Sequence, residues 1–181
     1  MSYYRLAMSD SATVIVLVMH GEPPRDFPRE AVGQYFALHE QVASAPPDRA
    51  QALRERLASV EARMRAWPRS AANDPFYAGS VALARALEQA TGLPVRLAFN
   101  EFCAPSVPEA LDQAAASARR VVLVSPMMTP GGTHAESDIP RAVDAARRRH
   151  PDVEFVYAWP YDLDEVAAFL ARHLRRYAGR A

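Results

Sequence analysis

Two histidines stand where an apolar run gives way to a loop. His20 follows the run TVIVLVM at 13–19, and His134 lies in the glycine-containing loop after the run VVLV at 121–124. Neutral imidazole is a good ligand for first-row divalent metals and can take up a proton near neutral pH. Two imidazoles that meet across a cleft could therefore hold a metal ion loosely or accept protons from a substrate.

Acidic side chains accompany both histidines. Glu101 follows the run VRLAFN at 95–100, and Glu136 and Asp138 follow His134. We predict that Glu101 is a third ligand or a proton relay, with Glu136 as a weaker candidate for the same roles. Asp138 stands at the start of a helical stretch and is predicted to cap it. A His–Glu–His set around an open cleft suits a divalent ion with free coordination positions.

The remaining histidines and the single cysteine are predicted to have plain structural roles. His39 lies in a helical stretch, His150 ends a helix before Pro151, and His173 lies beside arginines in the last amphipathic stretch. All three are expected to face solvent, and a cation suits the helix end at His150. Cys103 alone allows neither an intramolecular disulfide nor a multi-cysteine metal site, and we expect it to be a small buried hydrophobe.

Four short apolar runs alternate with helical patterns, and these elements must position the candidate residues. Strands are expected at 13–19, 95–100, 121–125 and 153–158, with helices at about 75–91, 106–118, 138–150 and 163–177. This alternation predicts an α/β fold with a doubly wound, flavodoxin-like, four-stranded parallel sheet. Ligands of such sheets bind beyond the C-terminal strand ends, where the strand order reverses. Strand order 2-1-3-4 would bring His20 to face His134 there.

The stretch 25–74 interrupts the alternation. Apolar residues recur at helical spacing over 27–42, and a second helix is expected after the break APPD at 45–48. We expect one domain over 1–181, with a helical insert at about 25–74. The insert could be a surface subdomain or a lid, and its start directly beside His20 favours the lid.

The composition excludes several classes of function. Half of the residues are hydrophobic and the formal net charge is zero, so bulk binding of nucleic acid is not expected. The apolar run at 14–19 is too short to span a bilayer, and residues 1–12 show no signal-peptide pattern, so we expect no membrane insertion and a cytoplasmic location. The sequence contains no nucleotide fingerprint, phosphate loop or nucleophile elbow in the expected positions.

Four stretches carry a family resemblance. They are VIVLVMHG at 14–21, LAFNEFCAPSVPEAL at 97–111, RRVVLVSPMMTPGGTHAESDIPRAV at 119–143 and HPDVEFVYAWP at 150–160. Their most specific parts are the runs E-x-x-x-P-S-x-x-E-A-L and G-G-x-H-x-x-x-D-I-P, in this order. Together with the helix expected at 75–91, these stretches resemble the class II tetrapyrrole chelatases, the sirohydrochlorin cobaltochelatase and ferrochelatase family.

The resemblance implies insertion of Co²⁺ or Fe²⁺, with Ni²⁺ as a further candidate, into sirohydrochlorin or a related tetrapyrrole without a nucleotide. The two metal-binding histidines of the family match His20 and His134, so the metal is a substrate held by these side chains. Gly131 and Gly132 would let the loop backbone approach a flat macrocycle. Met127 would add an apolar contact to the ring, with core packing as the alternative.

One region departs from the shortest family members. The stretch GEPPRDFPREAVGQYF at 21–36 is closer to the lid region of protoporphyrin ferrochelatases, which leaves the identity of the ring open. A ring with eight carboxylates favours arginines near the cleft, and all 21 cationic residues are arginines, of which Arg25 and Arg29 are expected there. Full-length family members have two lobes. The single lobe here implies a cleft that a second copy completes, hence a homodimer, or one that the insert caps.

Two other functions remain open at the level of sequence. The first is a tetrapyrrole or metal carrier of the same fold without turnover. The second is a histidine-dependent phosphotransfer or hydrolytic enzyme that uses His20. The usual phosphohistidine signature has an arginine before that histidine, and here the residue is Met19, which disfavours the second alternative.

Overall fold

The computed structural model describes residues 13–178 as an alternating α/β chain. The stretch 1–12, for which the sequence predicts no signal peptide, lies outside the described residues. The elements in chain order are β1 (Thr13–Met19), α1 (Arg29–Ser44), α2 (Pro47–Arg65), α3 (Pro75–Thr91), β2 (Val95–Phe99), α4 (Val107–Ala115), β3 (Arg120–Val124), the π-helical turn η1 (His134–Asp138), α5 (Ile139–Arg149), β4 (Glu154–Tyr157) and α6 (Leu163–Leu174).

The strands form one parallel four-stranded sheet in the order β2-β1-β3-β4, which confirms the predicted fold class. Met19 lies opposite Phe99 on β2, and Leu17 lies opposite Val124 on β3. The strand order reverses between β1 and β3. The segments that follow β1, β2 and β3 therefore leave the sheet at the same edge, at the point where ligands of open α/β sheets bind.

Helices cover the two faces of the sheet unequally. On one face, α4 and α5 pack on Val14, Val16 and Val18 of β1 and on the inward residues of β3 and β4. On the other face, α3 packs over β1 and β2, where Leu17 and Met19 are buried. Because β1 is central and covered on both sides, its sequence is an uninterrupted apolar run rather than an alternating one.

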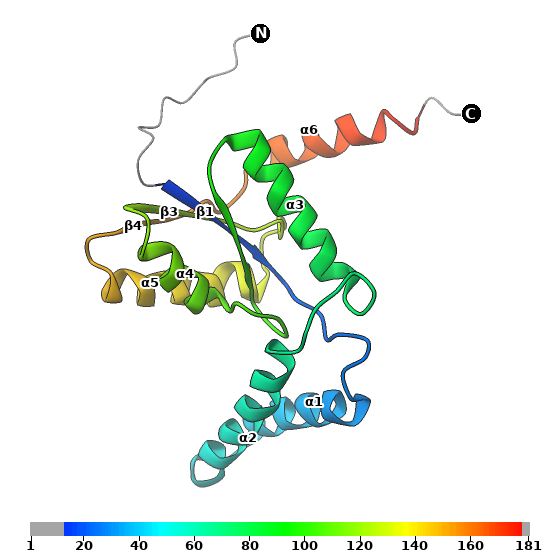
Figure 1. The fold of residues 1–181 in the computed structure, drawn as a ribbon, viewed down its shortest axis with the longest axis vertical. Coiled ribbons are helices and arrows are strands. Elements are labelled where there is room, and N and C mark those ends of the chain that lie inside the picture. Colours follow the sequence, from blue (N-terminus) through cyan, green and yellow to red (C-terminus); the bar gives the residue numbers. More distant parts are fainter. Residues whose placement is uncertain (1–12, 179–181) are drawn as a thin grey trace.

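The insert between β1 and α3 is a pair of helices with its own small core. Helices α1 and α2 pack on each other through Tyr35, Leu38, Val60 and Met64, and the pair lies beyond the C-terminal end of β1 (Figure 1). The first helix begins at Arg29 rather than at Phe27, which packs into this core from the preceding turn. The insert is therefore on the edge of the sheet where the candidate residues lie.

Side chains cap the starts of α3, α4 and α6, whereas α1, α2 and α5 have no side-chain cap. Asp74 accepts a hydrogen bond from the Tyr77 N–H at the start of α3, and Ser106 forms a capping box with Glu109 at the start of α4. Two helices are shorter than expected: α4 ends at Ala115, and α6 ends at Leu174. Within residues 13–178, no helix has both the length and the apolar character that crossing a bilayer requires.

Candidate metal centre at the strand ends

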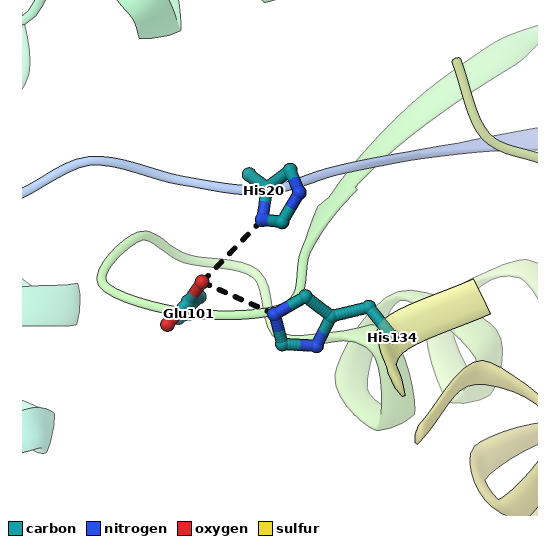
Figure 2. A group of neighbouring side chains, drawn as sticks. All are labelled: His20, Glu101 and His134. Atoms are coloured by element: carbon teal, nitrogen blue, oxygen red, sulfur yellow. Dashed lines mark hydrogen bonds and ion pairs between the residues drawn. The ribbon is translucent and has the colours of Figure 1, made fainter. Parts of the chain in front are cut away.

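His20, Glu101 and His134 converge at the C-terminal edge of the sheet (Figure 2). Glu101 Oε1 lies 3.4 Å from His20 Nδ1 and 3.2 Å from His134 Nε2. The two imidazole rings meet edge to face with their centroids 4.9 Å apart. The sequence-predicted set is thus brought together, with one ligand atom from each residue within 4.8 Å of the other two.

Backbone pairing beyond β1 and β2 places His20 beside Glu101. The Asn100 N–H donates to the Met19 carbonyl, and the Glu101 N–H donates to the His20 carbonyl at 3.1 Å. Gly21 makes this approach possible, because its φ is +116° and a Cβ there would stand 1.9 Å from the Glu101 carbonyl oxygen. Only glycine fits both the conformation and the space, so the His-Gly pair after the first strand is a structural requirement of the site.

The loop that carries Glu101 is held by two arginines of the insert region. Arg65, at the end of α2, donates to the Cys103 carbonyl at 2.7 Å and to the Asn100 carbonyl at 2.8 Å. Arg69 donates to the Phe102 carbonyl and pairs with the buried carboxylate of Asp74 at 2.5 Å. These side chains fix the backbone on both sides of Glu101.

Asp138 orients His134 and does not cap a helix. The prediction that Asp138 caps the following helix is wrong, because α5 has no side-chain cap and the helical path already begins one turn earlier, at His134, in the π-helical turn. The His134 Nδ1 lies 2.7 Å from Asp138 Oδ2, and Arg141 binds the other oxygen of the same carboxylate. A carboxylate thus lies on each ring nitrogen of His134, and the shorter contact to Asp138 favours a proton on Nδ1 over one on Nε2.

The other loop candidates do not belong to the convergent set of His20, Glu101 and His134. Glu136, the weaker candidate ligand, is exposed and accepts a hydrogen bond from the Gly131 N–H at 2.7 Å, so it stabilises the loop. Gly131 has a φ of +91°. Both Gly131 and Gly132 are exposed, and a Cβ added to either would meet no other atom within 4 Å. Met127 is half-buried against the core under α4 and α5.

The insert contacts the loop that carries Glu101 through aromatic side chains of α1. Its Tyr35 packs against Phe102 with ring centroids 5.2 Å apart, and the centroid of the exposed Phe36 ring lies 6.1 Å from that of Phe102. Burial, followed by the negative charges of Glu61 and Glu101, raises the pKa of Tyr35 to about 12. The residues expected to meet substrate carboxylates, Arg25 and Arg29, are both exposed on the segment that follows His20.

An open cleft of about 600 Å³ runs between the insert and the sheet domain beside this centre. It is lined from α2 by Glu61 and Arg65, from the end of η1 by Asp138, and from α5 by Arg141. Asp138 thus both lines the cleft and is hydrogen-bonded to His134.

The remaining histidines and the cysteine are mostly where the sequence placed them. His39 and His173 are exposed, and Cys103 is buried, as predicted. The prediction for His150 is wrong, because its ring is half-buried and its Nε2 lies 2.8 Å from Asp112 Oδ1. This pair joins the end of α5 to α4 and lies apart from the metal centre.

The three ligand atoms have the spacing of a metal site with open positions. Ligands about 2.1 Å from a metal in tetrahedral geometry lie about 3.4 Å apart, close to the two distances observed to Glu101 Oε1. The ligand nitrogens of His20 and His134 lie within 4.8 Å of each other. The His20 side chain is 48% exposed, so the site is open to solvent on one side. Two imidazoles and a carboxylate suit Fe²⁺, Co²⁺, Ni²⁺ or Zn²⁺ rather than Mg²⁺ or Ca²⁺.

The fold and the site together define an α/β protein with an open His–Glu–His cluster, a candidate metal centre, at the reversal of its parallel sheet. A model of the CbiX family matches residues 73–176, more than half of the chain. The chain belongs to the CbiX family. The sirohydrochlorin cobaltochelatase of Priestia megaterium is 36% identical over 73 residues, which are 40% of this chain and 24% of that enzyme.

A solved structure shares the fold over nearly the whole chain. A putative cobalamin (vitamin B12) biosynthesis CbiX protein from Marinobacter aquaeolei VT8 superimposes with a TM-score of 0.53 at 13% identity, over 93% of this chain and 99% of that one. A weaker match is SirB of Bacillus subtilis, solved with Fe³⁺, with a TM-score of 0.47 at 16% identity, over 94% of this chain and 48% of that one.

Proposed function

We propose that this protein inserts a divalent metal, Co²⁺ or Fe²⁺, into sirohydrochlorin or a closely related tetrapyrrole, without a nucleotide. The observation that carries the proposal is the convergence of His20, Glu101 and His134 on one open point at the sheet edge. If Asp138 accepts the Nδ1 proton of His134, the Nε2 lone pair faces the Glu101 carboxylate at 3.2 Å. Two acceptors at that distance need a cation between them, either a metal ion or a proton.

The arrangement suits the steps of metal insertion. His20, Glu101 and His134 would replace part of the water shell of the ion and hold it on the open side of the site. The ring nitrogens would then take the ion from that side. Insertion releases two pyrrole protons, and the groups left without a metal, an imidazole and the Glu101 carboxylate, can accept them. Asp138 would keep His134 oriented during this exchange.

Contacts to the macrocycle are proposed on both sides of the metal centre. The exposed glycine pair 131–132 would let the loop lie close to one face of the ring. The exposed aromatic ring of Phe36, packed over Phe102 beside Glu101, offers an apolar surface on the insert. Arg25 and Arg29 would meet peripheral carboxylates.

The test is an absorbance assay of metal-free sirohydrochlorin with Co²⁺, Fe²⁺ and Ni²⁺ in turn. We expect the wild-type chain to accelerate insertion of at least one ion, and the double variant His20→Ala, His134→Ala to lose the acceleration. The control His39→Ala, an exposed histidine of α1, should keep the full rate. A double variant that inserts metal at the wild-type rate would refute the assignment of the site.

The same assay separates the enzyme from a carrier. A carrier of the same fold would bind the macrocycle tightly, seen as a shift of its absorbance bands, and give no rate gain with any of the three ions. Repeating the assay with protoporphyrin tests the ring, since a preference for protoporphyrin would contradict sirohydrochlorin as the substrate.

A further inference from the structure

The end of helix α2 is hydrogen-bonded to the backbone on both sides of Glu101. The guanidinium of Arg65, the last residue of α2, donates to the Asn100 carbonyl at 2.8 Å and to the Cys103 carbonyl at 2.7 Å. Glu61, one turn earlier, accepts from Arg65 Nε at 2.8 Å and orients the guanidinium. The Arg65 side chain is only 17% exposed. A planar fork of donors can bind two carbonyls in a fixed geometry, which the compact ammonium group of a lysine does not offer.

The backbone turn after Glu101 is strained and depends on the insert. Phe102 has a φ of +59°, in the left-handed region that non-glycine residues rarely adopt. The turn closes with a hydrogen bond of 2.7 Å from the Cys103 N–H to the Glu101 carbonyl. The ring of Phe102 is buried in the insert core against Tyr35, and its carbonyl accepts from Arg69. Strained residues persist only where surrounding contacts hold them, so the contacts from the insert determine this turn.

The carboxylate of Glu101 has no separate anchor. Within residues 13–178, its hydrogen-bond partners are His20 and His134 (Figure 2), the two residues with which it would share a metal. Its position is therefore set through the backbone of its loop. A metal ligand lies about 2.1 Å from the ion, so a displacement of about 1 Å would remove the carboxylate from the coordination shell.

The same contacts argue against a lid that swings clear of the site. Arg69 donates to the Glu22 carbonyl at 2.7 Å, two residues after His20, as well as to the Phe102 carbonyl. The Arg69 side chain is 6% exposed and pairs with the buried Asp74. The insert region is thus bonded to the segments after β1 and β2, each of which carries a candidate ligand. A movement of the insert would displace these ligands with it.

We propose that Arg65 is a positioning residue of the metal centre, through which the insert holds Glu101 at the distance that a metal requires. The inference rests on the metal centre of the proposed function, because it takes Glu101 to be a ligand of the substrate metal. The insert is then a fixed support of the third ligand rather than a lid. Loss of the Arg65 guanidinium should leave a site of two histidines.

A double-mutant cycle on Co²⁺ binding tests the proposal without tetrapyrrole. The wild-type chain, Arg65→Met, Glu101→Gln and the double variant are titrated with Co²⁺ by calorimetry. Arg65→Met should weaken binding about 10–100-fold. The double variant should bind no more weakly than Glu101→Gln, because both changes remove the same ligand, whereas two independent losses would add. The visible absorption of bound Co²⁺, which depends on its ligand set, should change in the same way in both single variants.

Two further variants separate positioning from folding, and urea unfolding is measured for every protein in the series. Arg56→Met, which replaces an exposed arginine of the same helix, should bind Co²⁺ like the wild-type chain. Arg65→Lys keeps the charge and the fold but not the fork of donors. It should also weaken Co²⁺ binding, and it provides a second cycle with Glu101→Gln.

The outcomes distinguish this proposal from the proposed function. Wild-type affinity in Arg65→Met and Arg65→Lys, or additive losses in the double variants, would overturn the positioning role and leave the proposed function intact. Wild-type affinity in Glu101→Gln would overturn both, because the carboxylate would then not be a metal ligand. The expected cycle in a chain that accelerates no metal insertion would support the positioning role and refute the enzymatic function alone.

Discussion

The chemistry at residue scale depends on how His134 is held. Its ring lies between two carboxylates, Asp138 at 2.7 Å on Nδ1 and Glu101 at 3.2 Å on Nε2. The shorter contact, from Asp138, positions the His134 ring, because Asp138 is itself held by Arg141. The longer contact shares its carboxylate oxygen with His20. The outer carboxylate is therefore placed to favour a proton on Nδ1, and the inner one would be free to contact a bound metal.

Replacing Asp138 by asparagine should weaken metal binding without unfolding the chain. An amide no longer favours the Nδ1–H tautomer of His134, and loss of such an outer partner typically lowers metal affinity about 10–100-fold. The measurement is a calorimetric titration with Co²⁺. Asp144→Asn is the matched control, since Asp144 lies on α5, is exposed and bonds only to Arg147 among the described residues. Equal affinities of Asp138→Asn and the wild-type chain would contradict a positioning role.

Replacing Gly21 by alanine should strongly destabilise the fold. The new Cβ would overlap the Glu101 carbonyl, and the backbone would be held at a φ of +116°, which together should cost on the order of 3 kcal/mol or more. Urea unfolding measures the change. Gly33→Ala in α1, where a Cβ meets nothing within 4 Å, should instead stabilise by about 0.5–1 kcal/mol. If both variants unfold at the wild-type urea concentration, the close approach at Gly21 has been misjudged.

At residue scale, the sequence predicts the members of the site better than their roles. His20 can be found because it directly follows an apolar run, and His134 because it lies in the glycine-containing loop after another. The strand order then places both at one edge of the sheet. The role of Asp138 cannot be predicted from the sequence. An aspartate that caps a helix and an aspartate that binds a histidine four residues earlier have the same local pattern. What decides between them is the π-helical turn, which begins the helical path at His134.

At the scale of elements, the insert is the feature that the sequence explains least. Its helices are expected to form a lid, but its arginines also act as a clamp on the loop between β2 and α4. Arg65 and Arg69 together bind the carbonyls of Asn100, Phe102 and Cys103. No periodicity predicts these contacts, because they join residues more than 30 positions apart. The helices themselves can be predicted from local spacing alone.

Removing the Asp74 carboxylate should loosen this clamp. Asp74 is buried, pairs with Arg69 and caps α3, so Asp74→Ala leaves a buried guanidinium without its counter-charge. The expected loss is about 3–5 kcal/mol in the free energy of unfolding. Asp144→Ala, which breaks an exposed aspartate–arginine pair, should change it by less than about 1 kcal/mol. Similar losses in the two variants would argue against a structural role for the buried pair.

At the scale of the whole molecule, topology brings the centre together from distant parts of the chain. His20, Glu101 and His134 follow three different strands, and the parallel order β2-β1-β3 delivers all three to one edge. This much is predictable, because hydrophobic runs alternating with helices allow few topologies. The projection of α6 away from the sheet (Figure 1) is not predictable from the sequence, because its amphipathic pattern is equally consistent with packing on its own sheet. The pattern specifies a buried face but not the surface that buries it.

Because the centre joins three strand ends, metal binding should stabilise the whole fold. A ligand that binds the native state alone adds about 1.4 kcal/mol of stability for each tenfold rise in concentration above its dissociation constant. For a domain of this size, that corresponds to a rise in melting temperature of about 3–6 °C per tenfold increase in Co²⁺. Calorimetric melting across a Co²⁺ series measures the slope.

Two controls should leave the melting temperature unchanged. Mg²⁺ should not raise it, since imidazole is a poor ligand for Mg²⁺. The variant His20→Ala, His134→Ala should also give a flat line. A wild-type melting temperature that does not respond to Co²⁺ would show that the three side chains do not form a metal site in the folded protein.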